Sequence, residues 1–331
     1  MSFQPLTQQG AVTSQLLAAL NSQLGLILPT QGQIYWVKPN SGSDSYDGLS
    51  AGSAFKTLLR ALQACTANQN DVVLFCAESN TAARTTDYQA ATLDWNKDLT
   101  HLIGVNSGPF LGQRSRISNL SSAAALNPMV KVSANGCLIS GLEFFQGTPA
   151  SGTTSVALQV TGQRNTILNC QISGNGDLTG VADVAGSRSL LISGSENTFK
   201  GCYIGLDTVI RATQTSEVEI TAGARNYFEA CHFESYTSLS TFKAVVIATG
   251  CDRWMKFKDC DFTACQNITS ATAPTGAIGI TTMNGQVFMK NPYVYGYAQI
   301  VTADNAYVQV LGLNGLATGH LIGIAQGVDA T

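Results

Sequence analysis

Residues 194–204 read Gly194-Ser-Glu-Asn197-Thr-Phe199-Lys-Gly-Cys202-Tyr-Ile204, and this stretch decides the fold because it recurs along the chain. Segments that begin at Gly162 and Gly223 align with it without gaps and share the pattern G-x-x-N-x-[IF]-x-x-C-x-[IF]. Weaker copies extend the series, and the positions equivalent to the cysteine are Leu142, Cys170, Cys202, Cys231, Cys260 and Asn291. The steps between them are 28, 32, 29, 29 and 31 residues, which indicates a repeat of about thirty residues.

Apolar residues alternate within each copy, as in Cys170 and Ile172, and a second alternating run precedes each copy. These earlier runs cover residues 157–160, 189–192, 217–220 and 244–247. A period of two residues is typical of strands, and Gly and Asn stand at the corners between the runs. The sequence therefore predicts an all-β fold, a single-stranded parallel β-helix over residues 34–312, with coils stacked about 4.8 Å apart.

Stacked coils place equivalent side chains directly above one another, so two ladders are expected. They are an inward column of thiols at Cys170, Cys202, Cys231 and Cys260, and a row of amides at one corner at Asn165, Asn197 and Asn226. Asparagine tolerates positive φ and bonds to the backbone of turns. A metal site needs ligands that converge on one point, whereas a column spreads them along an axis. The thiols are therefore interpreted as core packing.

Composition excludes several classes of protein. Charged residues make up 12% of the 331-residue chain and hydrophobic residues 44%, a balance opposite to that of disordered chains. The formal net charge is −3 and no two basic residues are adjacent, so no nucleic-acid partner is expected. No apolar run reaches the roughly 18 residues of a membrane helix, and the first residues lack the pattern of a secretory signal. The nine cysteines are expected to be buried, reduced thiols.

Residues 34–62 have a layout of their own, in which a short strand leads through Asp47-Gly-Leu-Ser50 to a helix predicted over residues 55–62. Ser53 is the expected N-cap of this helix. A strand over residues 71–76 and the segment 99–105 follow. This order resembles the first coil of pectate-lyase-like right-handed parallel β-helix proteins, particularly those of bacteriophage virions. The resemblance covers residues 34–145 by motif, and it implies a right-handed solenoid with a helix that caps its open end.

The two ends of the chain differ from the repeat. Leucines recur every four residues at Leu16, Leu20, Leu24 and Leu28, which indicates an amphipathic helix in an arm of residues 1–33. This helix either folds onto its own domain or packs against another copy or another protein, and its uncharged polar face favours attachment. Residues 313–331 are rich in Gly and Ala and are expected to form an extended tail.

The sequence contains no strong catalytic motif. Glycoside hydrolysis needs two carboxylates, and the resemblance implies lyases that bind Ca²⁺ through clustered acids, but here no two acids are adjacent. The three histidines, His101, His232 and His320, lie far apart in the sequence. No nucleophile elbow, phosphate-binding loop or dinucleotide fingerprint is present.

Two pairs of acids and one insertion remain as candidate sites. The pairs Asp259/Asp261 and Glu217/Glu219 alternate with apolar residues and are interpreted as a solvated polar face. The longest insertion between coils covers residues 173–189 and contains Asp177, Asp183 and Arg188. A site there is a weaker alternative, because nothing in the sequence shows that these side chains converge.

These observations favour a non-enzymatic protein with no catalytic, cofactor-binding or metal-binding residues. The resemblance implies a bacteriophage virion protein, and the regular coils favour a trimeric capsid decoration (cement) protein on the outer surface of the particle. Its expected partners are copies of itself and the major capsid protein, and the expected place of synthesis is the bacterial host cytoplasm. The alternatives are a tail spike, a depolymerase or lyase acting on host polysaccharide, and a carbohydrate-binding spike without catalysis.

Overall fold

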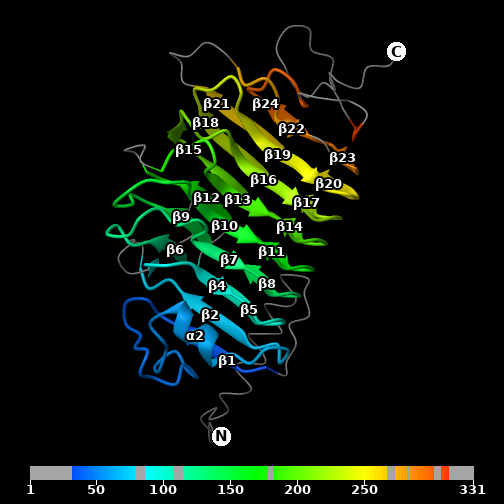
Figure 1. Cartoon of the computed structure of the whole chain (residues 1–331). Coiled ribbons are helices and arrows are strands. Elements are labelled where there is room, and N and C mark those ends of the chain that lie inside the picture. The colour runs from blue at the N-terminus through cyan, green and yellow to red at the C-terminus, as the bar shows by residue number, and fades with distance from the viewer. Residues whose placement is uncertain are drawn as a thin grey trace, which may run out of the picture.

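The computed structural model describes residues 32–79, 86–106, 115–177, 182–266, 273–281, 284–301 and 307–312. Its strands pair in parallel and build three sheets, which follow one another around each coil of a solenoid (Figure 1). The chain climbs from the blue N-terminal coils to the orange C-terminal coils. This architecture confirms the predicted all-β parallel β-helix.

The three sheets differ in their number of strands. Sheet A contains β1 (Ile34–Val37), β2 (Val72–Cys76), β5 (His101–Val105), β8 (Leu138–Ser140), β11 (Thr166–Leu168), β14 (Thr198–Lys200), β17 (Tyr227–Glu229), β20 (Trp254–Lys258), β23 (Gln286–Lys290) and β25 (Val308–Leu311). Sheet B contains β3 (Thr86–Gln89), β6 (Arg116–Asn119), β9 (Glu143–Gln146), β12 (Gln171–Asn175), β15 (Tyr203–Arg211), β18 (His232–Thr237), β21 (Asp261–Gln266) and β24 (Tyr293–Tyr295). Sheet C contains β4 (Leu93–Trp95), β7 (Val130–Val132), β10 (Val156–Val160), β13 (Arg188–Ile192), β16 (Ser216–Ala222), β19 (Lys243–Gly250) and β22 (Ile278–Ile280).

The core is built from inward columns of apolar side chains, because alternate residues of a strand point to opposite faces. On sheet A, Phe199, Phe228 and Phe257 lie in register, with ring centroids 4.7 and 4.9 Å apart. On sheet B, Phe233 stacks on Phe262 at 4.7 Å. Stacked aromatic rings bury large apolar surfaces and fix the register of successive coils.

The thiol column lies at the corner between sheets A and B. Cys170, Cys202, Cys231 and Cys260 are buried, and no disulfide joins them. Each Sγ–H donates to a carbonyl of the preceding coil, as from Cys202 to Ile167 at 3.4 Å. From β8 to β24 the corner is short, and two residues join each sheet A strand to the sheet B strand that follows. The first of these two residues has a positive φ, 50° at Asn169 and 61° at Gly201.

The sequence alignment of the last copy is wrong by one residue. Met289 lies in register with Phe257, so Asn291 is equivalent to Asp259 and Pro292 takes the position of Cys260. Asp259 and Asn291 have φ values of 51° and 49°. The physical reason is that the corner demands a residue that tolerates positive φ, and asparagine meets this demand better than most residues.

The asparagine ladder lies at the corner between sheets C and A. Asn197 Oδ1 accepts the N–H of Asn165 at 2.9 Å, and its Nδ2 donates to the carbonyl of Gly162 at 3.0 Å. Asn165 and Asn226 repeat the same two bonds one coil below and one coil above. Each buried amide thus satisfies a donor and an acceptor that the strand ladders leave free at the corner.

At this corner the residue before each asparagine adopts a positive φ, and the asparagine itself does not. Arg164, Glu196 and Arg225 have φ values of 57°, 60° and 57°. Their side chains form an exposed chain of ion pairs, in which Glu196 contacts both arginines at 2.6 Å. The asparagines are therefore selected for the reach of their amides rather than for their backbone conformation.

The helix that caps the solenoid begins later than predicted. It is α2 (Leu58–Ala64), and its N-cap is Thr57, whose side chain accepts the N–H of Arg60. Ser53, the expected N-cap, instead donates its hydroxyl to Asp47 at 2.6 Å. Phe55 pairs with Val37 as an isolated bridge, which keeps it out of the helix. Leu58, Ala61 and Leu62 are buried and lie next to β1 and β2 at the N-terminal end (Figure 1).

Residues 1–31 of the predicted arm and the predicted tail lie outside the described residues. This applies to the leucines at 16, 20, 24 and 28 and to residues 313–331. The boundaries at residues 33 and 313 therefore stay predictions of the sequence.

The asparagine ladder predicts a specific loss of stability. Replacing Asn197 by Ala leaves the N–H of Asn165 and the carbonyl of Gly162 without partners, and this change should lower the free energy of unfolding by about 1–3 kcal/mol. The measurement is denaturant unfolding followed by circular dichroism. Lys200→Ala, an exposed change in the same coil, is the control and should shift stability by less than about 1 kcal/mol. Equal stability of the two variants would contradict the ladder.

Candidate functional site

The outer face of sheet B carries a group of chemically active side chains that contact one another. Alternation turns Phe233 and Phe262 into the core and leaves His232, Glu234 and Asp261 on the outside. We call this surface the sheet B face; it lies on the left of the molecule in Figure 1. In register order, its first column consists of Thr86, Arg116, Glu143, Gln171, Tyr203, His232, Asp261 and Tyr293.

Five residues from three adjacent coils form what we call the His232 cluster: Tyr203, His232, Glu234, Asp261 and Cys265. His232 Nε2 lies 2.9 Å from Glu234 Oε2, and its Nδ1 lies 3.5 Å from Asp261 Oδ2. Glu234 also accepts the hydroxyl of Tyr203 and, at 3.6 Å, the thiol of Cys265. The Tyr203 and His232 rings pack at a centroid distance of 4.9 Å. An imidazole is thus held between two carboxylates on an outward surface.

The charges of the cluster follow from these contacts. Burial opposes the charged imidazole, but the hydrogen bonds and charges of Asp261 and Glu234 outweigh it and raise the pKa of His232 to about 9. The hydrogen bond from His232 lowers the pKa of Glu234, against the effect of its own burial. Burial and the neighbouring Glu234 raise the pKa of Tyr203. Near neutral pH, the cluster therefore holds an imidazolium beside an ionised carboxylate and a neutral phenol.

The cluster has the parts needed for proton transfer. His232 is a proton donor with 31% of its side-chain surface exposed, and Asp261 is a carboxylate with 51% exposed. Both reach solvent, whereas Glu234 lies deeper at 13% and orients the imidazole. A donor and an acceptor that face the same exposed surface can act as general acid and general base on one substrate.

Sequence reasoning missed this cluster because it searched for groups that are close along the chain. His232 and Asp261 are one coil apart and follow directly after Cys231 and Cys260. The signal was the repeat itself: residues that follow successive inward cysteines must lie side by side on the outer face. Of the other histidines, His101 is buried and its Nδ1 accepts the N–H of Leu138 at 3.0 Å, whereas His320 lies outside the described residues.

Asp259 and Asp261 are both exposed, as the sequence predicts, but the prediction that they lie beside each other is wrong. Asp259 occupies the positive-φ position of the A–B corner, where its Oδ1 accepts from Asn291 Nδ2 at 2.9 Å. Asp261 starts β21 and lies beside His232 instead. The two carboxylates therefore serve different neighbours.

The interpretation of Glu217 and Glu219 as a solvated pair is also wrong. Glu217 is fully buried and forms an ion pair with Arg211, Nε to Oε1 at 2.8 Å, with both side chains at 0% exposure. Ser189 donates to the second oxygen of Glu217, as does Gln214 at 3.2 Å. Glu219 lies near the surface and pairs with Arg188. The two glutamates differ because Glu217, near the start of β16, is buried at the corner between sheets B and C. Glu219 lies further along the strand and is only partly buried.

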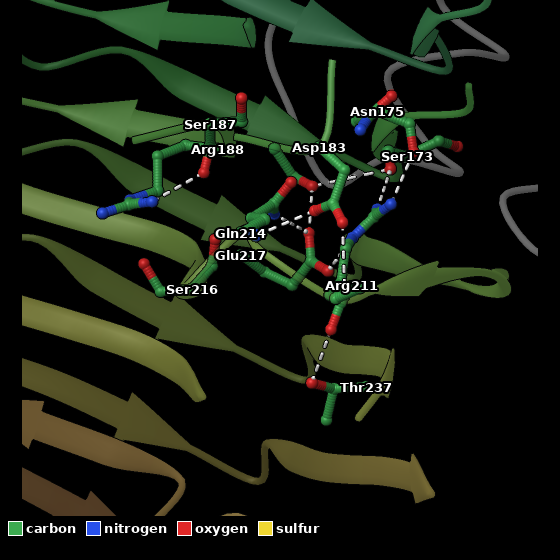
Figure 2. A network of polar contacts seen from close by, with 12 residues as sticks. Ser173, Asn175, Asp183, Ser187, Arg188, Arg211, Gln214, Ser216, Glu217 and Thr237 are labelled. Carbon is green, nitrogen blue, oxygen red and sulfur yellow. Dashed lines mark hydrogen bonds and ion pairs between the residues drawn. The ribbon is translucent and has the colours of Figure 1, made fainter. Parts of the chain in front are cut away.

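The insertion of residues 173–189 completes this buried network rather than an open site (Figure 2). Asp183 accepts the backbone N–H groups of Ala212, Thr213 and Gln214 at 2.8–2.9 Å. Asp177 accepts the N–H of Ala182, and Arg188 points away from the network toward Glu219. The three candidate residues, Asp177, Asp183 and Arg188, therefore do not converge. Their contacts fold the insertion back onto the solenoid.

Arg211 ties the insertion to the corner. Besides Glu217, its guanidinium donates to the carbonyls of Asn175 at 2.6 Å and Ser173 at 3.4 Å (Figure 2). A buried ion pair is costly to desolvate, and it is stable only when hydrogen bonds satisfy its remaining donors and acceptors. Three N–H groups of Arg211 and both oxygens of Glu217 are paired in this way, while Ser173 Oγ, Asn175 Nδ2, Gln214 Oε1 and Ser216 Oγ around them have no partner among the described residues. Because Arg211 and Glu217 have no access to solvent, we assign the pair a structural role.

In the part of the chain that the structure describes, no group of three or more His, Cys, Asp or Glu side chains could hold a metal ion. Within the same ranges, no helix is long and apolar enough to cross a membrane.

Comparison with known proteins identifies the architecture. No protein-family model and no curated protein matches the chain. Among solved structures, a rhamnogalacturonan lyase matches with a TM-score of 0.55 and 14% identity, covering 85% of this chain and 73% of that one. The chain folds as a pectate-lyase-like parallel β-helix. A pectin methylesterase from Aspergillus niger matches this β-helix with a TM-score of 0.50 and 13% identity, covering 88% and 82% of the two chains.

The prediction of a non-enzymatic protein is contradicted by these matches. These two structures are named as enzymes, a lyase and an esterase. Regular coils and a low charge content therefore do not exclude catalysis on this architecture. The function of this chain has to be argued from its own side chains.

The buried ion pair predicts a large effect of a single substitution. Arg211→Met leaves Glu217 buried without its cation and should lower the free energy of unfolding by about 3–5 kcal/mol. Arg225→Met is the matched control, because Arg225 is 47% exposed and its pair with Glu196 should contribute less than about 1 kcal/mol. Chemical denaturation measures both. A loss for Arg211→Met no larger than that of the control would contradict the assigned role.

The His232 cluster predicts an unusual titration. By NMR, the ring of His232 should titrate near pH 9, and Asp261→Asn or Glu234→Gln should lower this pKa. His101 is the internal control, because burial lowers its pKa below 6.5. Since folding raises the pKa of His232, its stabilising contribution is complete below pH 6.5 and is lost as the pH rises toward 9. Titration of His232 at or below 6.5 would contradict the geometry of the cluster.

Proposed function

We propose that this protein is a glycoside hydrolase of the β-helix type, which binds an extended polysaccharide along the sheet B face and cleaves it at the His232 cluster. The observation that carries the proposal is the imidazolium of His232 held beside Asp261 on an open surface. The names of the matched structures, a rhamnogalacturonan lyase and a pectin methylesterase, agree with a carbohydrate substrate for this architecture.

Exposed aromatic rings support binding of a sugar chain next to the cluster. Tyr293 and Tyr295 lie one coil above Asp261 and Thr263, with 47% and 53% of their surfaces exposed. Tyrosine combines an apolar ring with a polar hydroxyl, a combination suited to the faces and edges of sugar rings. Exposed rings of this kind favour a ligand with alternating apolar and hydroxylated surfaces.

The proposed reaction assigns one role to each exposed group. His232 donates its proton to the glycosidic oxygen as the bond to the anomeric carbon breaks. Once this bond has broken, Asp261 accepts a proton from a water molecule whose oxygen forms the new bond to the anomeric carbon. Because Asp261 Oδ2 lies only 3.5 Å from His232 Nδ1, this water attacks from the same side of the sugar as His232. Glu234 stabilises the imidazolium and, together with Tyr203, fixes the orientation of the ring. After cleavage, the proton on Asp261 returns to His232 through solvent.

The family resemblance in the sequence suggests a biological context for this activity. The resemblance to β-helix proteins of bacteriophage virions favours the tail-spike alternative, in which the substrate is a polysaccharide of the host surface. The position on the virion, the trimeric state and the capsid partner stay predictions of the sequence.

The proposal is tested by incubating the protein with pectic and bacterial capsular polysaccharides and measuring new reducing ends. Hydrolysis should give reducing ends without unsaturated products. His232→Gln and Asp261→Asn should each reduce the rate by about 10²–10⁴-fold. The rate should also fall above pH 9, as His232 loses its proton.

Asp259→Asn is the matched control, because it removes an exposed carboxylate two residues from Asp261 without touching the cluster. It should leave the rate unchanged. Absence of products from every polysaccharide, or full activity of His232→Gln and Asp261→Asn, would refute the assignment. Unsaturated products would show an elimination reaction in place of hydrolysis.

A further inference from the structure

We infer that residues 1–31 of the chain fold back along the outer face of sheet A and cover its first five strands. The covered surface consists of outward apolar side chains on β1, β2, β5, β8 and β11, and we call it the sheet A stripe. Its members are Ile34, Trp36, Val72, Leu74, Ile103, Leu138 and Leu168. The inference does not depend on the proposed hydrolysis, which takes place on the sheet B face.

The sheet A stripe lies on the opposite side of the sheet from the core. Alternation turns Val73 and Phe75 of β2 into the main core, so Val72 and Leu74 point outward. The outward residues form an apolar cluster of their own, and no described residue outside sheet A belongs to it. The helix α2 packs against the main core instead. The described part of the chain therefore supplies no cover for the stripe.

The outward side chains of the stripe are nevertheless as buried as core residues. Val72, Leu74 and Ile103 are only 3–4% exposed. On the same face of a later coil, Phe288 has paired strands on both sides and is still partly exposed. Neighbours within the sheet thus do not enclose an outward side chain by themselves. Because the structure contains a single chain, the cover of the stripe comes from that chain.

Two short connections outside the described residues do not account for this cover. Residues 80–85 and 107–114 follow the ends of β2 and β5 and lead toward sheet B. Val105, the outward residue of β5 nearest to the second connection, is 44% exposed. The buried residue Ile103 lies further back along the same strand. The cover therefore lies over the middle of the strands and not over the border with sheet B.

The N-terminal segment joins the described residues at the right place. It precedes β1, which is the first strand of the stripe. The N–H of Gln33 donates to Asp71 Oδ1 at 2.7 Å, and a Cβ at Gly32 would lie only 2.2 Å from the carbonyl oxygen of Asn70. Glycine thus lets the chain pass close to the residues that precede β2. From this point, a segment that precedes β1 can run across the strands toward β11.

The leucines of this segment match the sheet A stripe in length and in chemistry. Leu16, Leu20, Leu24 and Leu28 would span about 18 Å in a helix that rises about 1.5 Å per residue. Five stacked strands span about 19 Å, at about 4.8 Å per step. Residues 1–31 contain no Asp, Glu, Lys or Arg, so their burial desolvates no charged side chain. A short helix also needs a partner surface, because it is only marginally stable alone in water.

The test places the photoreactive amino acid p-benzoylphenylalanine at position 28 or 16 of the full-length chain. Mass spectrometry then identifies the peptides that become crosslinked. Since residue 28 is closer to β1 along the chain, it should crosslink to β1 and β2, and residue 16 should crosslink to β8 and β11. Position 18 is the control and should give about tenfold fewer crosslinks to sheet A, because residues two apart do not face the same side of a helix.

The occupant is identified by irradiating a mixture of ¹⁵N-labelled and unlabelled protein. Crosslinks to the sheet A stripe should join peptides of the same isotope composition. Crosslinks between labelled and unlabelled peptides would show a second copy on the stripe and would overturn the inference. Crosslinks to another face, or none to sheet A, would also overturn it.

A second measurement uses the melting temperature. Leu20→Ser combined with Leu24→Ser should lower it by about 5 °C, because two apolar contacts with the stripe are lost. Gln15→Ser combined with Ala18→Ser changes the opposite side of the predicted helix and should leave it unchanged. Equal melting temperatures of the two double variants would contradict the inference. Neither measurement involves catalysis, so failure of the hydrolase assignment and failure of this inference are distinguishable.

Discussion

The structure depends on the stacking of each coil on the one before it, in register. A parallel ladder satisfies the backbone along the strands, but at each corner the chain leaves the ladder and its polar groups need other partners. Asn165, Asn197 and Asn226 supply these partners at the C–A corner, and a positive φ turns the chain at the A–B corner. With the register fixed, every position of the repeat becomes a column, either of core side chains or of surface groups.

This constraint explains how much could be predicted from the sequence. Inward positions repeat, because each coil has to fill the same space, and the repeat predicted the β-helix and its strands. The predictions failed where local hydrogen bonds or the local backbone conformation decide which residue occupies a position. Ser53 bonds to Asp47 and leaves the capping of α2 to Thr57, and Asn291 matches the positive φ of Asp259 rather than the position of Cys260. Spacing alone carries no information about such local hydrogen bonds.

Candidate sites were harder to predict, because outer columns have no common pattern. His232, Glu234 and Asp261 look unrelated in the sequence, and their chemistry emerges only when one coil is laid over the next. Glu217 shows the opposite case, since its alternation with Val218 predicts exposure. The corner and the insertion bury it against Arg211 instead. Burial at a corner depends on the length of the connection that covers it, which varies from coil to coil.

The two-residue A–B corner has a consequence for access to the molecule. Because this connection never lengthens between β8 and β24, no loop can rise along that border of the sheet B face. The connections at the opposite border, from sheet B to sheet C, are the ones that vary in length. Residues 176–187 separate β12 from β13, but only residues 212–215 separate β15 from β16. A polymer can thus settle on this surface sideways, at any point along its length, without threading a free end. Such an open flank suits attack in the middle of long chains rather than trimming from their tips.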